Sequence, residues 1–246
     1  MDLSRPRSGT VWNHGIRTPG ANSRRSFGPC KAPRHIRSKP WPKISTAAVP
    51  ARFAFELLQN ADDNQFKRAR ETGALPSFAF EVHPRHIVVE CNEDGFSKND
   101  LEAICTVGKS TKSAKYGYIG AKGIGFKSVF IAAWKVYIQS GHFSFRFEHD
   151  KGDPGLGMVT PIWQDAAEEL PSPLTRMTLY LHDKGDPSEF EHLRGIIFEQ
   201  LSAIQPTCLL FLQNLKQIRV AFYGEDGQLE HARKFRRVMV ITTVSF

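Results

Sequence analysis

Three polar residues in the segment 56–64, ELLQNADDN, have a spacing that would place them on one face of a helix. Glu56, Asn60 and Asp63 follow one another at intervals of four and three positions, and residues at these intervals are neighbours on a helix surface. Side-chain oxygens are the ligands that Mg²⁺ prefers, and a nearby carboxylate can act as a base toward water. The stripe therefore predicts a magnesium and water site, and a solvated helix face is the alternative.

Glycines are concentrated in a second segment, 117–130, GYIGAKGIGFKSVF. Gly120, Gly123 and Gly125 form a GxxGxG pattern, and glycine lets backbone N–H groups approach phosphate oxygens without interference from a Cβ atom. A helix that begins just after the glycines would add partial positive charge, and Lys122 and Lys127 would add full charges. The segment predicts a phosphate-binding loop, with a flexible turn before a buried helix as the alternative.

This glycine segment matches neither of the two common nucleotide-binding fingerprints. Gly120 and Gly125 have the spacing of a Walker motif, but Phe126 occupies the position where that motif requires lysine. The segment also lacks the GxGxxG order, the βαβ unit and the downstream acid of a Rossmann site.

Two turns and one strand contain further candidates. The acid-rich turn NEDGF, 92–96, follows a predicted strand, and an oxygen acceptor there would bind the exocyclic amine of a purine. The segment 108–113, GKSTKS, is small, polar and cationic and would fold over a triphosphate as a lid. Thr175 enters a predicted strand. Taken one by one, each of these also fits a surface turn, a solvated loop or a buried strand threonine.

The segments that must position these residues have either a helical or a strand-like sequence pattern. Apolar residues at helical spacing predict helices, and short aromatic or β-branched runs predict strands. Ser97 and Asp100 form a capping-box pattern at one helix start. Helices are predicted over 51–71, after a turn within 93–108, from 129–133 and over 187–206. The predicted strands are 78–82, 86–91, 134–141, 143–150, 157–164, 176–183, 216–235 (a hairpin) and 238–246. This order predicts an α+β fold with helices on one face of a mostly antiparallel sheet.

Taken together and in this order, the segments ELLQNADDN, NEDGF, STKS, GYIGAKGIGFKSVF and TRMTLYL resemble the motif series of the GHKL ATPase superfamily. The pattern NEDGF…ICTVGKSTK…GYIGAKGIGFKSVF looks most like the sacsin/Nov-type branch of Hsp90-like ATPase domains. The resemblance covers roughly residues 51–200 and is strongest over 56–64 and 91–130. It implies a Bergerat-type sandwich that binds ATP and Mg²⁺.

The resemblance also implies a role for each matching residue. Glu56 would orient and deprotonate the attacking water, and Asn60 would bind Mg²⁺. Asp63 would lie near the nucleotide, Gly95 beneath the adenine, and Thr175 beside an adenine-bound water. The implied nucleotide-binding residues of the lid and glycine segments are Lys109, Ser110, Thr111, Gly120, Lys122, Gly123, Ile124, Gly125 and Phe126.

One position departs from the family pattern. When the first box is aligned without gaps, the aspartate that accepts from the adenine amine aligns with Cys91. A thiol is a weak acceptor, so Asn92 or Asp94 is the candidate replacement.

The charge of the chain is unevenly distributed. The 246 residues carry a net charge of +8, but residues 1–50 hold ten Lys or Arg and one acid, and residues 51–246 hold 23 bases and 24 acids. We expect the Pro-, Arg- and Ser-rich leader 1–50 to be disordered. The ATP-binding domain would then be 51–246, and its end within a predicted strand suggests truncation. The basic leader is also a candidate arm for nucleic acid.

Several classes of protein are excluded by composition. No run of about 18 apolar residues is present, and the N-terminus lacks the apolar core of a secretory signal. The four cysteines form no CxxC pair, which argues against a zinc site or a disulfide framework. We expect an intracellular protein, cytoplasmic or nuclear.

Three functions fit these observations. The leading one is a Mg²⁺-dependent ATP-binding domain that hydrolyses ATP slowly, coupled to lid closure in a sacsin-like chaperone or regulatory protein. The second is a scaffold that keeps the GHKL fold without nucleotide, and the third is a nucleic-acid-associated GHKL ATPase.

Overall fold

The computed structural model describes residues 52–105, 124–149, 160–166, 169–171 and 174–237. The chain divides into two units, Met1–Pro33 and Arg34–Phe246, and every described residue lies in the second unit. The expected disorder of 1–50 and the expected strand 238–246 therefore concern residues outside the described part of the chain.

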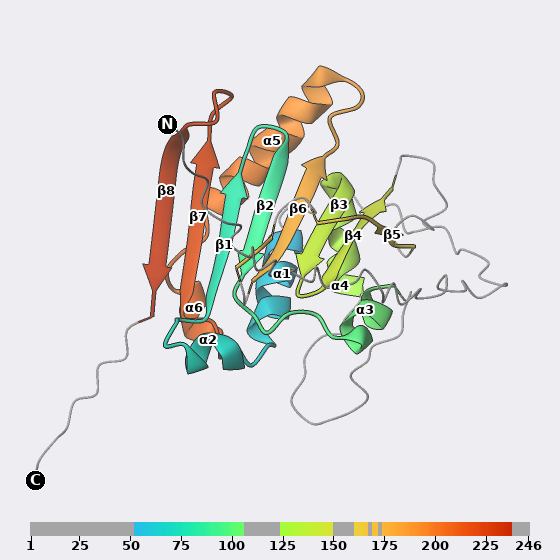
Figure 1. The fold of residues 1–246 in the computed structure, drawn as a ribbon. Helices are drawn as coiled ribbons and strands as arrows, with labels where there is room; N and C mark the ends of the chain where they lie inside the picture. The colour runs from blue at the N-terminus through green and yellow to red at the C-terminus, as the bar shows by residue number, and fades with distance from the viewer. Residues whose placement is uncertain (1–51, 106–123, 150–159, 167–168, 172–173, 238–246) are drawn as a thin grey trace, which may run out of the picture. The chain divides into compact units, whose positions relative to one another are not determined.

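The described part of the chain forms one mixed sheet in the order β5-β4-β3-β6-β2-β1-β7-β8 (Figure 1). Neighbouring strands are antiparallel except β1 and β7, which are parallel. The strands are β1 Ser77–Val82, β2 His86–Cys91, β3 Ala133–Ser140, β4 Phe143–Glu148, β5 Ile162–Trp163, β6 Thr175–Leu181, β7 Gln217–Tyr223 and β8 Leu229–Arg236. The predicted α+β class and mostly antiparallel sheet are confirmed.

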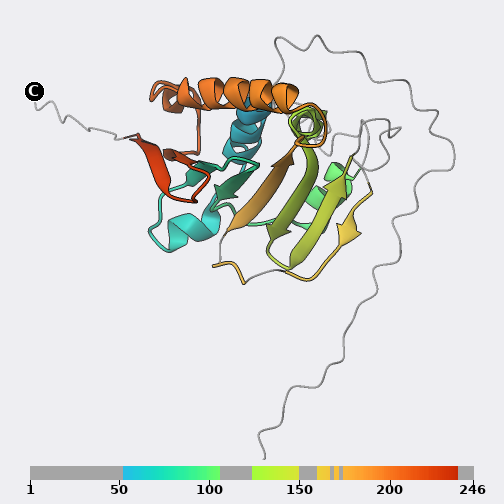
Figure 2. The same cartoon turned by 90° about the horizontal axis from the view of Figure 1, so that it is seen from above.

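Helices cover one face of this sheet. Seen from above, α1 and the long α5 lie on the same side of the strands (Figure 2). The helical elements are α1 Arg52–Asp62, α2 Lys67–Glu71, α3 Lys98–Ile104, α4 Ile124–Lys127, the 3-10 turn η1 Ser128–Ile131, α5 Pro187–Ser202 and α6 Cys208–Phe211. The helix predicted from Val129 thus begins five positions earlier, at Ile124.

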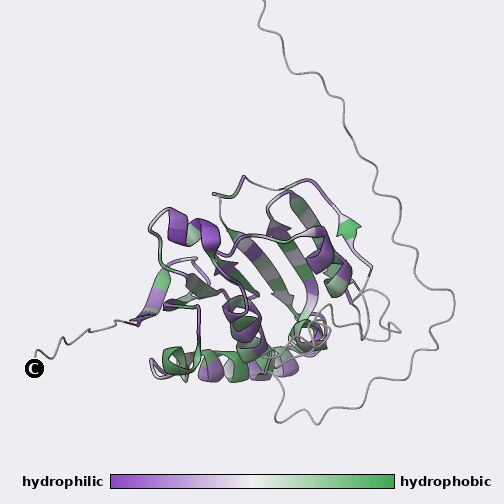
Figure 3. Cartoon of the chain, turned by 90° about the horizontal axis from the view of Figure 1, so that it is seen from below, coloured by the Kyte–Doolittle hydropathy of each residue, from purple (hydrophilic) through white to green (hydrophobic). Residues whose placement is uncertain are grey.

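Alternation along the strands creates the core. Hydrophobic and hydrophilic residues alternate along the strands (Figure 3), because successive side chains of a strand point to opposite faces. The buried face of the strands packs against apolar residues of α1 and α5. The main contributors are Phe53, Leu57, Leu58, Phe78, Phe80, Ile87, Val89, Val136, Ile138, Leu179, Leu181, Ile197 and Leu201.

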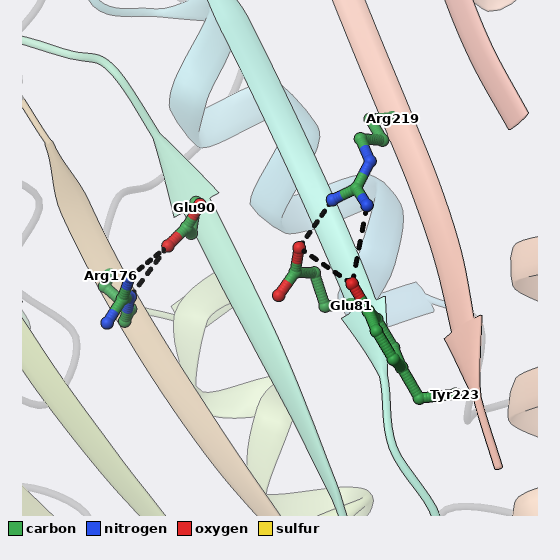
Figure 4. A network of polar contacts seen from close by, with 5 residues as sticks. All are labelled: Glu81, Glu90, Arg176, Arg219 and Tyr223. Atoms are coloured by element: carbon green, nitrogen blue, oxygen red, sulfur yellow. Dashed lines mark hydrogen bonds and ion pairs between the residues drawn. The ribbon is translucent and has the colours of Figure 1, made fainter. Parts of the chain in front are cut away.

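Ion pairs join neighbouring strands through their partly buried side chains (Figure 4). Glu81 of β1 accepts from Arg219 of β7, which lies beside Tyr223. Arg176 of β6 donates from Nε to Glu90 Oε1 of β2 at 2.7 Å. These pairs link β1 to β7 and β2 to β6 in addition to the backbone ladders.

Local caps fix two helix starts. The Asp100 amide donates to Ser97 Oγ at 3.3 Å, and the Ser97 amide donates to Asp100 Oδ2 at 2.9 Å. The predicted capping box of α3 is therefore confirmed. At the start of α5, Asp186 accepts from the Ser188 amide at 2.8 Å, and Pro187 stands in the first turn, where its missing N–H group costs nothing.

The single helix predicted over 51–71 is wrong, because the chain breaks between α1 and α2. Phe66 has a φ of 53° and is fully buried. Asp94 accepts from the backbone N–H groups of Lys67 at 3.1 Å and Arg68 at 2.9 Å. A distant carboxylate thus caps α2 and stabilises a second helix start that the apolar spacing alone does not reveal.

Candidate functional site

A cavity of about 100 Å³ lies where the end of α1 meets the end of β2 and the start of β6. Its walls are largely apolar, and a small set of polar groups joins them. The main apolar lining residues are Leu57, Phe78, Val89, Ile104, Phe126 and Met177, and the polar ones are Asn60, Asn64, Cys91, Glu93, Asp100 and Thr175. An apolar pocket with a few polar groups is the usual form of a small-molecule site.

Asn64 closes the C-terminal end of α1 and faces the loop after β2. Its Nδ2 donates to the carbonyl oxygens of Asn60 at 3.1 Å and Ala61 at 3.3 Å. The same Nδ2 donates to Oε2 of Glu93. Because Nδ2 faces backbone carbonyls, the orientation of this amide is fixed, and Glu93 is the acceptor of the pair.

Glu93 is the buried carboxylate of the cavity, whereas Asp100, the other acid in the lining, is only partly buried and is paired with Ser97. Glu93 is only 6% exposed, and no other acid among the described residues is buried to this degree. Burying a carboxylate is unfavourable unless hydrogen bonds satisfy it, and Asn64 supplies one such bond. The pair therefore ties α1 to the loop that follows β2 and places a hydrogen-bond acceptor on the cavity wall.

Cys91 and Thr175 are opposite each other in the β2–β6 register. Burial, followed by the charge of Glu93, holds the pKa of the Cys91 thiol well above its usual value, so this thiol is protonated at neutral pH. Thr175 Oγ1 and Ser140 Oγ lie 2.6 Å apart, and Ser140 Oγ also accepts from the Phe96 amide at 2.8 Å. None of Cys91, Thr175 and Ser140 carries a carboxylate, so these three side chains supply no acid at the end of β2.

Gly95 holds the loop between Glu93 and Phe96 in place. Its φ is +85°, a conformation that other residues adopt only with strain. A Cβ atom there would lie 3.6 Å from Ser140 Oγ and from the Gly141 nitrogen, which is ordinary contact. The backbone angle, rather than crowding, is therefore the reason for glycine at this position.

The structure brings four of the predicted site residues to the cavity: Asn60, Gly95, Phe126 and Thr175. Glu56 lies on α1 one turn before Asn60 and is partly exposed, but it does not line the cavity. Asp63 does not line it either. Among the described residues no group of three or more His, Cys, Asp or Glu side chains could hold a metal ion.

Neither proposed replacement for the first-box aspartate lines the cavity. Asn92 Oδ1 accepts from the Ser77 amide at 2.7 Å, and its Nδ2 donates to the Leu75 carbonyl at 2.8 Å. Asp94 caps α2, as described above. Both side chains stabilise the fold, and Glu93 between them is the one that reaches the cavity.

The remaining predicted residues belong to the lid and glycine segments. Ile124 and Gly125 are the first residues of α4. The other predicted residues of these two segments, Lys109, Ser110, Thr111, Gly120, Lys122 and Gly123, lie outside the described part of the chain.

Sequence reasoning missed Asn64 and Glu93, although signals for both existed. Asn64 follows Asn60 by four positions, which is one helical turn. Val89, Cys91 and Glu93 alternate with period two, which continues the inward face of β2 beyond its last residue. The strand pattern therefore pointed to Glu93 rather than to its two neighbours.

Lys127 of α4 lies close behind the cavity wall and is also buried, with 6% of its surface exposed. Its Nζ donates to the Ile104 carbonyl at 2.6 Å and lies 4.9 Å from the ring centroid of Phe147. Burial lowers its pKa to about 8. Lys127 thereby joins α4 to the C-terminal end of α3, next to Phe126 in the cavity wall.

Fold and site together define an α+β domain in which helices cover one face of a mostly antiparallel sheet and a cavity lies at the ends of α1 and β2. No family model matches the chain. The chain is homologous to a segment of Protein NO VEIN of Arabidopsis thaliana, with 36% identity over 180 residues. This alignment covers 68% of the present chain but only 6% of the plant protein.

Among solved structures, the chain is similar to the N-terminal domain of a DNA repair protein, with a TM-score of 0.44 and 16% identity over 72% of this chain and 50% of the other. At this TM-score the likeness adds nothing to the functional assignment. None of the described helices is long and apolar enough to cross a membrane.

Proposed function

We propose that this domain binds ATP with Mg²⁺ in the manner of the GHKL superfamily. The observation that carries the proposal is the convergence of four separate motif segments on one cavity. Asn60 comes from α1, Gly95 from the loop after β2, Phe126 from α4 and Thr175 from β6. The motif order suggested a common site, and the geometry that unites these residues supports it.

The chemistry of the lining fits a purine ring. Apolar side chains on several sides favour a flat aromatic ligand, and polar groups near Glu93 and Thr175 fit its edge. Asn60 offers an amide oxygen for Mg²⁺, which typically takes one or two protein ligands together with phosphate and water. In this proposal Glu56, one turn earlier on α1, is the base for slow hydrolysis.

Thermal unfolding of the full chain, with and without millimolar Mg·ATP, tests the proposal. A ligand that binds only the native state raises its stability by mass action, so we expect a higher Tm with Mg·ATP. Asn60→Ala should abolish this increase, whereas the control Gln59→Ala, an exposed position on the same helix, should keep it. An unchanged wild-type Tm, or an Asn60→Ala increase equal to that of wild type, would contradict ATP binding at this cavity.

A scaffold without nucleotide is the second candidate, and the neutral thiol of Cys91 favours it. Its expected result in the same experiment is a folded wild-type protein whose Tm does not respond to Mg·ATP. Nucleic-acid binding through residues 1–50 and lid closure by 106–122 stay predictions, since these residues lie outside the described part of the chain. Salt-sensitive DNA binding that disappears when 1–50 are deleted would support the former.

A further inference from the structure

We propose that a basic patch at one end of the sheet binds the phosphate backbone of single-stranded nucleic acid, and that Phe211 beside the patch stacks on a base. Six side chains from α2, the residue before β7 and the end of β8 define the patch: Lys67, Arg68, Arg70, Lys216, Arg236 and Arg237. The inference does not depend on the proposed nucleotide binding, and it concerns a surface of the described domain rather than the leader 1–50.

The arginines of the described chain differ in whether an acid neutralises them. Five arginines elsewhere on the domain each form an ion pair with an acid: Arg85, Arg146, Arg176, Arg194 and Arg219. Within the described residues, none of the six cations of the patch forms such a pair. The patch therefore keeps positive charge that those five arginines have lost to an acidic neighbour.

Contacts between elements far apart in sequence bring the cations together. Arg70 Nη2 donates to Asn214 Oδ1 at 2.9 Å, and the Arg237 amide donates to the Lys216 carbonyl at 2.9 Å. Figure 1 shows α2, α6 and the C-terminal end of β8 at the same end of the sheet. Burial, followed by the charges of Arg237 and Arg70, holds the pKa of Lys216 below its usual value, as expected where like charges lie close together. An anion bound here would relieve this repulsion.

The chain itself offers little negative charge to neutralise the patch. Asp62 opposes the effect of the arginines on Lys216, but its carboxylate accepts from three backbone N–H groups. Asp94 accepts from the first backbone N–H groups of α2. The residues outside the described part of the chain hold 15 Lys or Arg and only 4 acids. A separate, negatively charged partner is therefore the charge complement of the patch.

Beside the patch, α6 exposes two large apolar side chains. Leu210 is 68% exposed and Phe211 is 85% exposed. Arg237 Nη1 donates to the carbonyl oxygens of Leu209 at 3.1 Å and Leu212 at 2.7 Å, so its guanidinium lies against this short helix. Cations that contact phosphates beside an exposed aromatic ring that stacks on a base are the two components of single-strand binding. A duplex would leave the ring unused, because its bases are already stacked on one another.

A lipid surface fits the same residues less well. Binding in a membrane interface typically uses a helix with a broad apolar face. Here α6 has only four residues, and Ala69, the apolar residue of α2, is buried. The cations of α2 thus have no apolar neighbours on their own helix that could insert between lipids.

Fluorescence anisotropy of the full chain with labelled oligothymidylate of about 16 nucleotides tests the inference. The logarithm of the affinity should fall linearly with the logarithm of salt concentration, by about 0.7 for each phosphate contact. The patch variant Arg68→Gln/Arg236→Gln should reduce this slope by about 1.4 and weaken binding at low salt about tenfold. The control Arg85→Gln/Lys98→Gln removes the same charge from other exposed side chains and should bind as wild type does.

Phe211→Ala tests the stacking separately. We expect an affinity about tenfold lower than that of wild type with an unchanged salt slope, because the loss of one stacked base has an effect of this size. Phe55→Ala is the matched control, since Phe55 is an exposed phenylalanine of α1. Unchanged affinity in Phe211→Ala, or a duplex bound as tightly as the single strand, would overturn the assignment to single strands.

Three further outcomes would overturn the inference. The first is a wild-type protein that does not bind the oligonucleotide. The second is a control variant that weakens binding as much as the patch variant, because total charge would then govern binding. The third is patch-dependent binding to phosphatidylserine vesicles without oligonucleotide binding, which would assign the patch to lipid. Thermal unfolding shows whether each variant folds, and Arg68→Gln alone, with an expected slope change of about 0.7, replaces a double variant that does not.

Discussion

Glu56 lies one turn before Asn60 on α1, on the same side of the helix and outside the cavity wall. A base that acts at the far end of a triphosphate should affect hydrolysis more than binding of the purine ring. Glu56→Gln keeps the shape of the side chain but removes its basicity. We expect Mg·ATP affinity to stay within about twofold and turnover to fall by at least about a hundredfold.

Phosphate release under single-turnover conditions, together with Kd values, measures both effects of this change. Glu71→Gln is the matched control, because Glu71 is exposed on α2 and lies outside the proposed site. Hydrolysis that persists in Glu56→Gln would remove this residue from the proposed catalytic role.

At the scale of the element, Asp62 ties the end of α1 to the segment before β7. Its carboxylate accepts from the backbone N–H groups of Gln213, Asn214 and Leu215 at 2.7, 2.7 and 2.8 Å. Asp62→Ala would leave these groups without this acceptor, and we expect a loss of about 2–3 kcal/mol in the free energy of unfolding. Urea denaturation measures it, with Gln65→Ala as a control at an exposed position.

A value for Asp62→Ala indistinguishable from that control would show that water or other groups replace the three bonds. Asp62→Asn, which keeps one side-chain oxygen, should lie between the two variants.

The elements differ in how far sequence could predict them. The start of α3 was predictable because Ser97 and Asp100 lie three positions apart and satisfy each other. The break at Phe66 was not, because the carboxylate of Asp94 that caps α2 lies on a loop 27 positions from Lys67. Apolar spacing continues through Phe66, so local pattern alone favoured one uninterrupted helix.

The residues of the candidate site likewise divide into those that the sequence predicted and those that it did not. Asn60 was predicted from its helical spacing to Glu56 and Asp63, and Gly95 and Thr175 were predicted because their segments resemble the GHKL motif series. Glu93 was missed because its neighbours Asn92 and Asp94 are chemically similar, and only the three-dimensional partners show which side chains serve the fold. The alternation of inward-facing residues along β2 continues to Glu93 and indicated that its side chain faces inward. The alternation was not extended to Glu93 because 92–96 were predicted to be a turn.

At the scale of the whole molecule, the buried Lys127 makes stability depend on pH. Its pKa is lowered by burial from 10.5 to about 8, so above about pH 8 the native state has lost a proton that the unfolded state still binds. Stability therefore rises with pH across this range. We expect a gain of about 1 kcal/mol between about pH 7.5 and 9.

Urea denaturation at several pH values measures this gain, and Lys127→Met should remove it. Above about pH 9 the raised pKa of Cys91 acts in the opposite sense, because the unfolded thiol ionises and the native thiol does not. The comparison is therefore made below that pH, and an equal slope in Lys127→Met would contradict the assignment to Lys127.

The parallel pairing of β1 with β7 has a consequence for the order of folding. Asp62 and Asn214 are 152 residues apart in sequence, and β1 finds its second neighbour only when β7 is present. Such distant contacts slow folding, because a long loop must close before they form. During synthesis on the ribosome, α1 and β1 leave the exit tunnel long before their partners, so the helix that bears Asn60 acquires its final support only near the end of translation of this domain.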